Sequence, residues 1–301
     1  DPFCISSLSG FGTGDLLDEV VKQLPDELSN DGFDASLPRI AVVGRPNAGK
    51  SSLINAFIGE ERNIVTDIAG TTRDSIYTQY NKFGKSFYLV DTAGIRKKSK
   101  VNEDLEFYSV MRSIRAIENS DVCILMLDAT RGIEGQDQNI FSLIQRNKKS
   151  LVVCVNKWDL VEKDPHTVNR FEEKLKEDLK FMDYYKSIYI SAKTGQRVEK
   201  ILAAAEEVYA HASFRVPTGE LNDLIGDAVR LQEPPSYQGR RMRVFFSSQV
   251  GVCPPTFALF VNDERLLHFS YERYLENVIR KAYDFSGTPI KIVVREKKDE
   301  D

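Results

Sequence analysis

Short apolar runs alternate with longer amphipathic stretches between residues 39 and 210 of the 301-residue chain. The short runs are rich in β-branched residues and predict strands over residues 39–44, 86–91, 122–128, 150–156 and 187–191. The stretches between them repeat apolar residues at three- and four-residue steps and predict helices over residues 50–59, 103–119, 135–147 and 169–183. This alternation predicts an α/β domain with a mostly parallel sheet flanked by helices. Its ligand should lie at the carboxyl ends of the strands.

The pattern changes after His211, where a linker near residues 213–219 precedes a smaller set of elements. Their order is helix, strand, strand, helix, strand, over residues 218–231, 240–250, 256–262, 270–283 and 289–296. We therefore expect one domain over residues 39–211, a small α+β domain over 212–298 and a charged tail at 299–301.

The first residues of the chain resemble the end of the α/β domain. ISSLSGFGTGDLLDEVVKQL at residues 5–24 echoes ISAKTGQRVEKILAAAEEVY at 190–209, since each reads as strand, Ser-rich turn, Gly and helix. The echo predicts that residues 1–24 are the remnant of an upstream copy of the domain, joined by an acidic linker at 25–38. The lack of an initial Met also suggests a fragment.

Composition narrows the setting. The longest apolar stretch, residues 122–127, is far shorter than the roughly 20 residues that cross a bilayer, and the first residues do not form a secretory signal. Cys4, Cys123, Cys154 and Cys253 have no CxxC spacing, so we expect reduced thiols and a cytoplasmic protein rather than disulfides or metal ligands. With a net charge of −4, any nucleic-acid contact must come from local patches.

A phosphate-binding pattern follows the first predicted strand. Glycines let consecutive backbone N–H groups turn toward a β-phosphate, a lysine reaches the β and γ oxygens, and a hydroxyl binds Mg²⁺. Gly44, Gly49, Lys50 and Ser51 meet these needs at the start of a predicted helix, whose positive end favours anions. The alternative is a Gly-rich turn. The residues assigned to this P-loop are Gly44, Arg45, Pro46, Asn47, Ala48, Gly49, Lys50, Ser51 and Ser52.

Three further motifs each follow a predicted strand. At Asp91–Gly94 a carboxylate can hold a Mg²⁺ water and a glycine amide can meet the γ-phosphate. Asp159 can accept from two donors of guanine that adenine lacks, and Ser191–Lys193 can close over the base through a backbone N–H. Each alone could be a helix-capping loop. Together they predict a guanine-nucleotide site that includes Asp91, Thr92, Ala93, Gly94, Ile95, Asn156, Lys157, Trp158, Asp159, Ser191, Ala192 and Lys193.

These motifs resemble the five signature elements of the Ras-like, translation-factor-related GTPases. The fuller set GRPNAGKSSLINAF, TDIAGTTRD, DTAGIRKK, NKWD and SAKTG resembles the bacterial Der (EngA) family over essentially the whole chain. In that family two GTPase domains precede a KH-like domain. The resemblance implies a Ras-like P-loop GTPase domain followed by a small α+β KH-like domain. It further implies a cytoplasmic monomer that hydrolyses GTP and acts in assembly of the large (50S) ribosomal subunit, with ribosomal RNA and proteins rather than DNA or membrane as partners.

The resemblance also implies catalytic roles. Lys50, Thr72 and Gly94 match catalytic positions of the family, and Thr72 matches the switch threonine that joins Ser51 on Mg²⁺. Ile95 stands where many GTPases have a glutamine that orients the attacking water. We therefore expect slow intrinsic hydrolysis.

Asn47 matches a monovalent-cation ligand of potassium-activated relatives, and the carbonyls of Thr66, Ile68 and Thr71 would complete that K⁺ site. A cation there would offset developing charge, as an arginine finger does. The alternative is that Asn47 only stabilises the loop.

The terminal domain has no GXXG loop, the usual clamp of KH modules, and residues 215–301 hold 13 basic and 13 acidic residues. An RNA contact would depend on local groups, namely Arg240, Arg241, Arg243, Phe245, Phe246, Arg280 and Lys281. The alternatives are a phenylalanine core and a helix-dipole complement. Two other functions stay open: a tRNA-modification accessory GTPase, and an RNA-binding module that uses GTP as a structural ligand.

Overall fold

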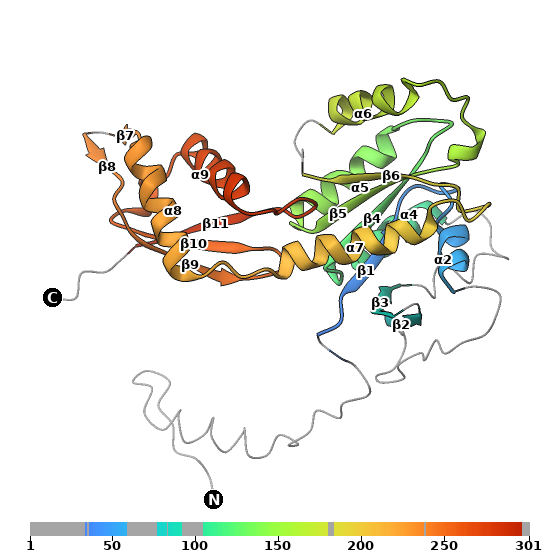
Figure 1. The fold of residues 1–301 in the computed structure, drawn as a ribbon, viewed down its shortest axis with the longest axis horizontal. Helices are drawn as coiled ribbons and strands as arrows, with labels where there is room; N and C mark the ends of the chain where they lie inside the picture. The colour runs from blue at the N-terminus through green and yellow to red at the C-terminus, as the bar shows by residue number, and fades with distance from the viewer. Residues whose placement is uncertain are drawn as a thin grey trace, which may run out of the picture.

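The computed structural model describes residues 34, 36–58, 77–82, 84–91, 105–179, 184–237 and 239–296. Two sheets with separate hydrophobic cores organise these residues (Figure 1). The predicted upstream remnant at 1–24, most of the predicted linker and the tail at 299–301 lie outside them. Within the described ranges, every helix is too short or too polar to cross a membrane.

The larger sheet has six strands in the order β2-β3-β1-β4-β5-β6. All neighbours run parallel except β2 and β3, which form an antiparallel pair at one edge. The mostly parallel sheet expected from the sequence is thereby confirmed. The strands are β1 (Arg39–Val43), β2 (Tyr77–Lys82), β3 (Lys85–Val90), β4 (Val122–Asp128), β5 (Ser150–Asn156) and β6 (Lys186–Tyr189).

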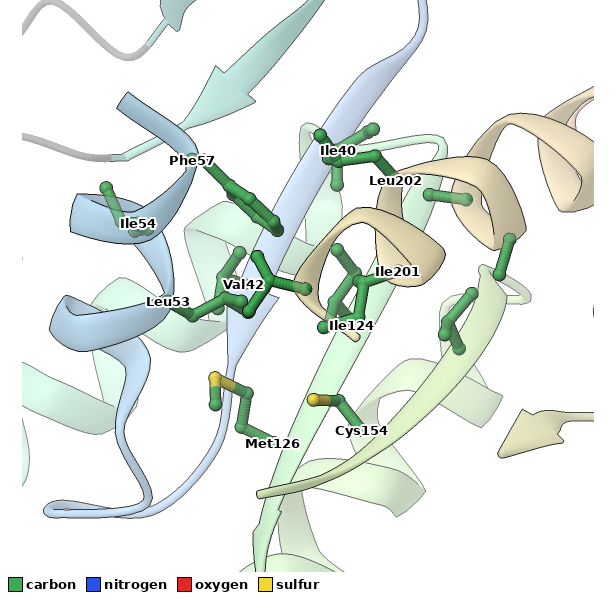
Figure 2. Packing of buried hydrophobic residues seen from close by; sticks show 14 of the residues in the cluster. Ile40, Val42, Leu53, Ile54, Phe57, Ile124, Met126, Cys154, Ile201 and Leu202 are labelled. Carbon is green, nitrogen blue, oxygen red and sulfur yellow. The ribbon is translucent and has the colours of Figure 1, made fainter. Parts of the chain in front are cut away.

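Helices cover both faces of this sheet. Successive strand side chains point to opposite faces, so Ile40 and Val42 of β1 enter one core and Ala41 and Val43 enter the other. Figure 2 shows the first core, in which α2 and α7 cover β1, β4 and β5. Helices α4, α5 and α6 supply the second. The helices are α2 (Lys50–Ile58), α4 (Leu105–Glu118), α5 (Gly135–Arg146), η1 (Trp158–Leu160), α6 (Thr167–Asp178) and α7 (Val198–Ser213).

The smaller sheet has the strand order β11-β10-β9, with β9 antiparallel and β11 parallel to β10. Leu221 of α8, Leu275 of α9 and Phe257 of β10 share one core, so both helices cover the same face. The predicted order of helix, strand, strand, helix, strand is found in α8, β9, β10, α9 and β11, with the short strands β7 and β8 added after α8. The elements are α8 (Thr218–Leu231), β7 (Ser236–Tyr237), β8 (Arg240–Arg241), β9 (Val244–Gly251), β10 (Thr256–Val261), η2 (Glu264–Leu266), α9 (Phe269–Ala282) and β11 (Lys291–Glu296).

The single strand predicted over residues 240–250 is wrong, because β8 and β9 are separate strands. The side chain of Asn262 bonds the backbone on both sides of the break: its Oδ1 accepts from the Arg243 N–H at 2.7 Å, and its Nδ2 donates to the Arg241 carbonyl at 3.1 Å. Met242 between them is buried in the core. The side chain at 242 thus turns inward and interrupts the pairing.

The two sheets are joined by α7 and by a turn that follows α9 (Figure 1). The Leu151 N–H at the start of β5 donates to the Gly287 carbonyl at 2.7 Å, and the Gly287 N–H donates to the Tyr184 carbonyl just before β6. The Ser150 hydroxyl donates to Thr288 Oγ1 at 2.9 Å. The turn therefore attaches the smaller unit to the amino ends of β5 and β6.

The cysteines agree with the expectation of reduced thiols. Cys123 and Cys154 are buried, Cys253 is half-buried, and all three are free; Cys4 lies outside the described residues.

Candidate nucleotide-binding site

The P-loop joins β1 to α2 and needs glycine at two positions. Gly44 has φ +147° and Gly49 has φ +104°, where L side chains are strained. A Cβ on Gly44 would lie 2.5 Å from the Met126 carbonyl oxygen, and one on Gly49 would lie 2.1 Å from Asn156 Nδ2. The loop is thus packed closely against the ends of β4 and β5.

Lys50 begins α2 and turns back over this loop. Its Nζ donates to the carbonyls of Gly44 and Arg45, each at 2.6 Å. Lys50 is half-buried, and these two bonds link the start of α2 to the beginning of the loop.

The NKWD motif follows β5 directly. Lys157 has φ 62°, which turns the chain sharply, and Trp158 is 3% exposed. The indole packs edge-on against Phe171 at 5.0 Å and beside Tyr189 at 4.5 Å between ring centroids. Trp158 is anchored in this way, and Asp159, the residue after it, is exposed at the carboxyl end of the sheet.

One carboxamide connects three of the motifs. Asn156 Nδ2 donates to the Ala48 carbonyl of the P-loop at 2.8 Å, and Asn156 Oδ1 accepts from the Ala192 N–H at 2.9 Å. Asn156 is 3% exposed, so both bonds are shielded from water. Its side chain fixes the spacing between the P-loop, the NKWD loop and the Ser191 loop.

Lys157 is held by a carboxylate that sequence reasoning missed. Its Nζ lies 2.5 Å from Asp128 Oδ2, at the end of β4. Burial alone would raise the pKa of Asp128, but hydrogen bonds from Lys157 and from the hydroxyl and N–H of Thr130 lower it below its ordinary value. An acidic residue at the carboxyl end of a predicted strand was the available signal.

Arg45 belongs to the P-loop by sequence, but its side chain is buried against the β4–α5 loop. The guanidinium is 3% exposed, pairs with Glu134 at 2.5 Å and donates to the Gly132 carbonyl at 3.2 Å. Asp137 lies 3.6 Å from it, and burial raises the pKa of that carboxyl. The P-loop is therefore tied to the β4–α5 loop, which the motifs did not reveal.

Asp91 directly follows β3, which lies beside β1 and parallel to it. It therefore lies at the same end of the sheet as the P-loop, where the parallel strands β1 and β3 finish. Within the P-loop and the start of α2, the exposed positions are Pro46, Asn47, Ser51 and Ser52. The remaining predicted site residues lie outside the described residues: Thr66, Ile68, Thr71, Thr72, Thr92, Ala93, Gly94 and Ile95.

Two family models match the chain. Residues 39–157 match a family described as 50S ribosome-binding GTPase, and residues 215–295 match one described as KH-domain-like of EngA bacterial GTPase enzymes, C-terminal. The GTPase Der of Porphyromonas gingivalis is 57% identical over 298 residues, which cover 99% of this chain and 68% of that protein. The chain belongs to the Der GTPase family. GTPase Der of Alkaliphilus metalliredigens is 48% identical over 303 residues, covering 100% of this chain and 68% of that protein.

Membership of the Der family establishes the main expectations from the sequence. The chain has a Ras-like P-loop GTPase domain followed by a KH-like domain, and it is a GTPase. Among solved structures, Era in complex with MgGDPNP and nucleotides 1506–1542 of 16S ribosomal RNA has a TM-score of 0.45 and 18% identity, covering 87% of this chain and 94% of that one.

Proposed function

We propose that this chain is a cytoplasmic GTP-hydrolysing switch that acts in assembly of the large ribosomal subunit. The ribosomal role is supported by the family matched over residues 39–157, described as 50S ribosome-binding GTPase. Guanine binding rests above all on one observation. The two hydrogen bonds of Asn156 hold the P-loop and the Ser191 loop together beside the exposed Asp159.

Each motif has one task in this proposal. The P-loop N–H groups and the Lys50 ammonium bind the β- and γ-phosphates, where charge shifts as the phosphoryl group transfers. Lys50 exchanges its bonds to the carbonyls of Gly44 and Arg45 for phosphate oxygens. Asp159 accepts from guanine, and Ser191–Lys193 close over the base.

The oxygen donors near the P-loop fit Mg²⁺, which prefers hard oxygen ligands. Ser51 is exposed in the first turn of α2, so its hydroxyl is accessible, and Asp91 follows the strand beside β1. Ser51 and Thr72 would hold the ion, and Asp91 would hold one of its waters. When bound, Mg²⁺ neutralises phosphate charge. Gly94 would donate its N–H to the γ-phosphate.

We also propose a K⁺ site at Asn47. This residue is exposed, and its φ of +64° is a left-handed conformation that Asn tolerates better than most residues. The carbonyls of Thr66, Ile68 and Thr71 would complete the site, and the cation would offset charge in the absence of a glutamine at Ile95. GTP hydrolysis should be slow and faster in KCl than in NaCl, and Asn47→Ala should lose the difference. Equal rates of the unsubstituted chain in the two salts would rule the site out.

The open face of the smaller sheet supports contact with RNA. Phe246 of β9 and Phe260 of β10 pair in register, and their rings stack 4.0 Å apart at 9° on the face opposite the core. Phe246 is 42% exposed. On β11, Lys291 and Arg295 pair with β10 residues of the same face and are exposed. Aromatic rings beside cations bind single strands by stacking and phosphate contact.

Two of the cations singled out in the sequence have partners within the protein. Arg280 bonds Glu276 at 2.9 Å and also donates to the carbonyls of Phe285 and Thr288. Arg241 pairs with Glu233. We therefore assign the RNA contact to the open sheet face rather than to the end of α9.

Co-sedimentation with 50S particles tests the ribosomal role. The chain should sediment with the particles under a GTP analogue and differently under GDP, and Lys50→Ala should abolish that dependence. Phe246→Ala with Phe260→Ala should weaken sedimentation under the analogue while leaving GTP hydrolysis unchanged. Absence of any nucleotide-dependent co-sedimentation would contradict the proposed role for this chain.

The two alternatives left open by the sequence gain no support. Similarity to GTPase Der over 99% of the chain favours a role in ribosome assembly over that of a tRNA-modification accessory GTPase. If the unsubstituted chain hydrolysed GTP no faster than Lys50→Ala, that result would instead favour an RNA-binding module that uses GTP as a structural ligand.

A further inference from the structure

A cavity of about 370 Å³ lies between the β4–α5 loop and the segment from η1 to α6. Its lining contains none of the P-loop, NKWD or Ser191-loop residues. The volume falls in the range of small-ligand sites, about 300–1,000 Å³. The lining residues are Leu127, Asp128, Ala129, Thr130, Arg131, Gly132, Ile133, Val155, Val161, Glu162, Thr167, Arg170, Phe171, Lys174 and Leu175.

The wall of this cavity is apolar. Leu127, Val155 and Leu175 are almost fully buried, and Phe171 packs its ring against the same core. An apolar wall of this kind favours a ligand with a flat hydrocarbon body, because water bound there makes few hydrogen bonds.

Of the three cations at the rim of the cavity, one forms no ion pair within the described residues. Arg131 is bound to Glu134 at 3.0 Å and Arg170 to Asp164 at 2.7 Å, whereas Lys174 has no such partner among the described residues. A Cβ on Gly132 would lie 3.4 Å from Lys174 Nζ, so the ammonium reaches across to the β4–α5 loop.

The last residue of β4 and the loop after it line the cavity and also contact the nucleotide motifs. Asp128 holds Lys157 of the NKWD motif at 2.5 Å, and Thr130 donates to the same carboxylate. The Gly132 carbonyl accepts from Arg45 of the P-loop at 3.2 Å. A ligand bound against this loop would therefore restrain the residues that position the NKWD loop and the P-loop.

We propose that this cavity binds a small monoanion on an aromatic body, such as an aryl sulfonate or aryl carboxylate, and that its occupancy slows release of GDP. Lys174 binds the anionic group and the apolar wall binds the rings. Glu162, also at the rim and exposed, repels a second negative charge. The coupling rests on the guanine-nucleotide function proposed above, whereas the binding does not.

Fluorescence titration of the full chain with 8-anilinonaphthalene-1-sulfonate tests the binding. Lys174→Gln should weaken binding about three- to fivefold, the range of an exposed ion pair. Glu162→Gln should strengthen it. Lys176→Gln, which removes an exposed lysine from the same helix outside the cavity, is the matched control and should bind as the unsubstituted chain does.

Filter binding with radiolabelled GDP tests the coupling. Saturating aryl sulfonate should slow GDP release about fivefold in the unsubstituted chain and in Lys176→Gln. Lys174→Gln should need about three- to fivefold more aryl sulfonate to reach half of that effect. Equal aryl-sulfonate affinity of Lys174→Gln and Lys176→Gln would overturn the site, and unchanged GDP release would overturn the coupling. If the chain bound no GDP, the proposed nucleotide function would fail, while the comparison of the two lysine variants would still decide the site.

Discussion

Gly49→Ala perturbs the contact that holds the nucleotide motifs together. The new Cβ would lie 2.1 Å from Asn156 Nδ2, too close for any non-bonded pair, so the carboxamide of Asn156 must move. Its bonds to the Ala48 carbonyl and the Ala192 N–H are then lost. Each loss leaves a buried group unpaired and costs about 1–3 kcal/mol. The backbone at φ +104° adds about 1–3 kcal/mol of strain.

The sum is about 3–9 kcal/mol, against a typical domain stability of about 5–15 kcal/mol. We expect a loss near the lower end, because the P-loop is a connection at the carboxyl end of β1, where the backbone can relax more than within a strand. Gly84→Ala is the control for strain alone. Gly84 has φ +71° and nothing within 4 Å of its Cβ position, so that change should cost about 1–2 kcal/mol.

A double-mutant cycle isolates the contact itself. Asn156→Ala removes the carboxamide, so Gly49→Ala should cost at least about 1 kcal/mol less in that background. The assay is urea unfolding followed by fluorescence of Trp158, the single tryptophan, with GDP affinity measured alongside. A local loss of about 3 kcal/mol corresponds to GDP binding weaker by roughly 100-fold. Additive costs in the cycle, or equal losses for Gly49→Ala and Gly84→Ala, would refute the reasoning.

Three further changes have definite outcomes. Asp159→Asn removes the acceptor for guanine and should reduce the preference for GTP over ATP about 10- to 100-fold in competition binding, with stability unchanged. The Asp128–Lys157 pair contributes its full stabilisation above the ordinary Asp pKa of 3.8, and this is lost as pH falls through the lowered pKa of Asp128. In Asp128→Asn, the free energy of unfolding should therefore depend less on pH below about pH 4. Gly287→Ala would place a Cβ 2.2 Å from Val208 Cγ2 and should separate one urea transition into two, as followed by circular dichroism.

The sequence predicts the larger sheet well because its buried parallel strands are continuous apolar runs. Strand β4, VCILMLD, is buried at every position. Strand β2, YTQYNK, escaped prediction because it is an edge strand that pairs on one side only, so polar residues are tolerated. Helix α6 begins at Thr167, earlier than expected, because the Asp164 N–H donates to its hydroxyl and orders the preceding turn.

The motifs identify the residues of the site but not the contacts that support it. Sequence spacing places Asn156 near a base, yet its bonds to the P-loop and to the Ser191 loop depend on how three strand ends meet in space. The same is true of Arg45. A basic residue in a P-loop suggests a phosphate contact, but its guanidinium is buried against the β4–α5 loop. Such tertiary pairings have no local pattern.

Two continuous elements connect the nucleotide motifs with the smaller sheet. Strand β5 runs from Ser150 and Leu151, which bond the turn at Gly287, to Asn156, which bonds the P-loop. Its seven residues span roughly 20 Å. Helix α7 begins shortly after the Ser191 loop, and the carbonyl of Ala212 near its end accepts from Cys253 of the KH-like part. Each element is therefore a continuous length of regular backbone between a nucleotide motif and a contact with the smaller sheet. A substitution that breaks the hydrogen bonds of Gly287 would remove the contact through β5 and leave the one through α7.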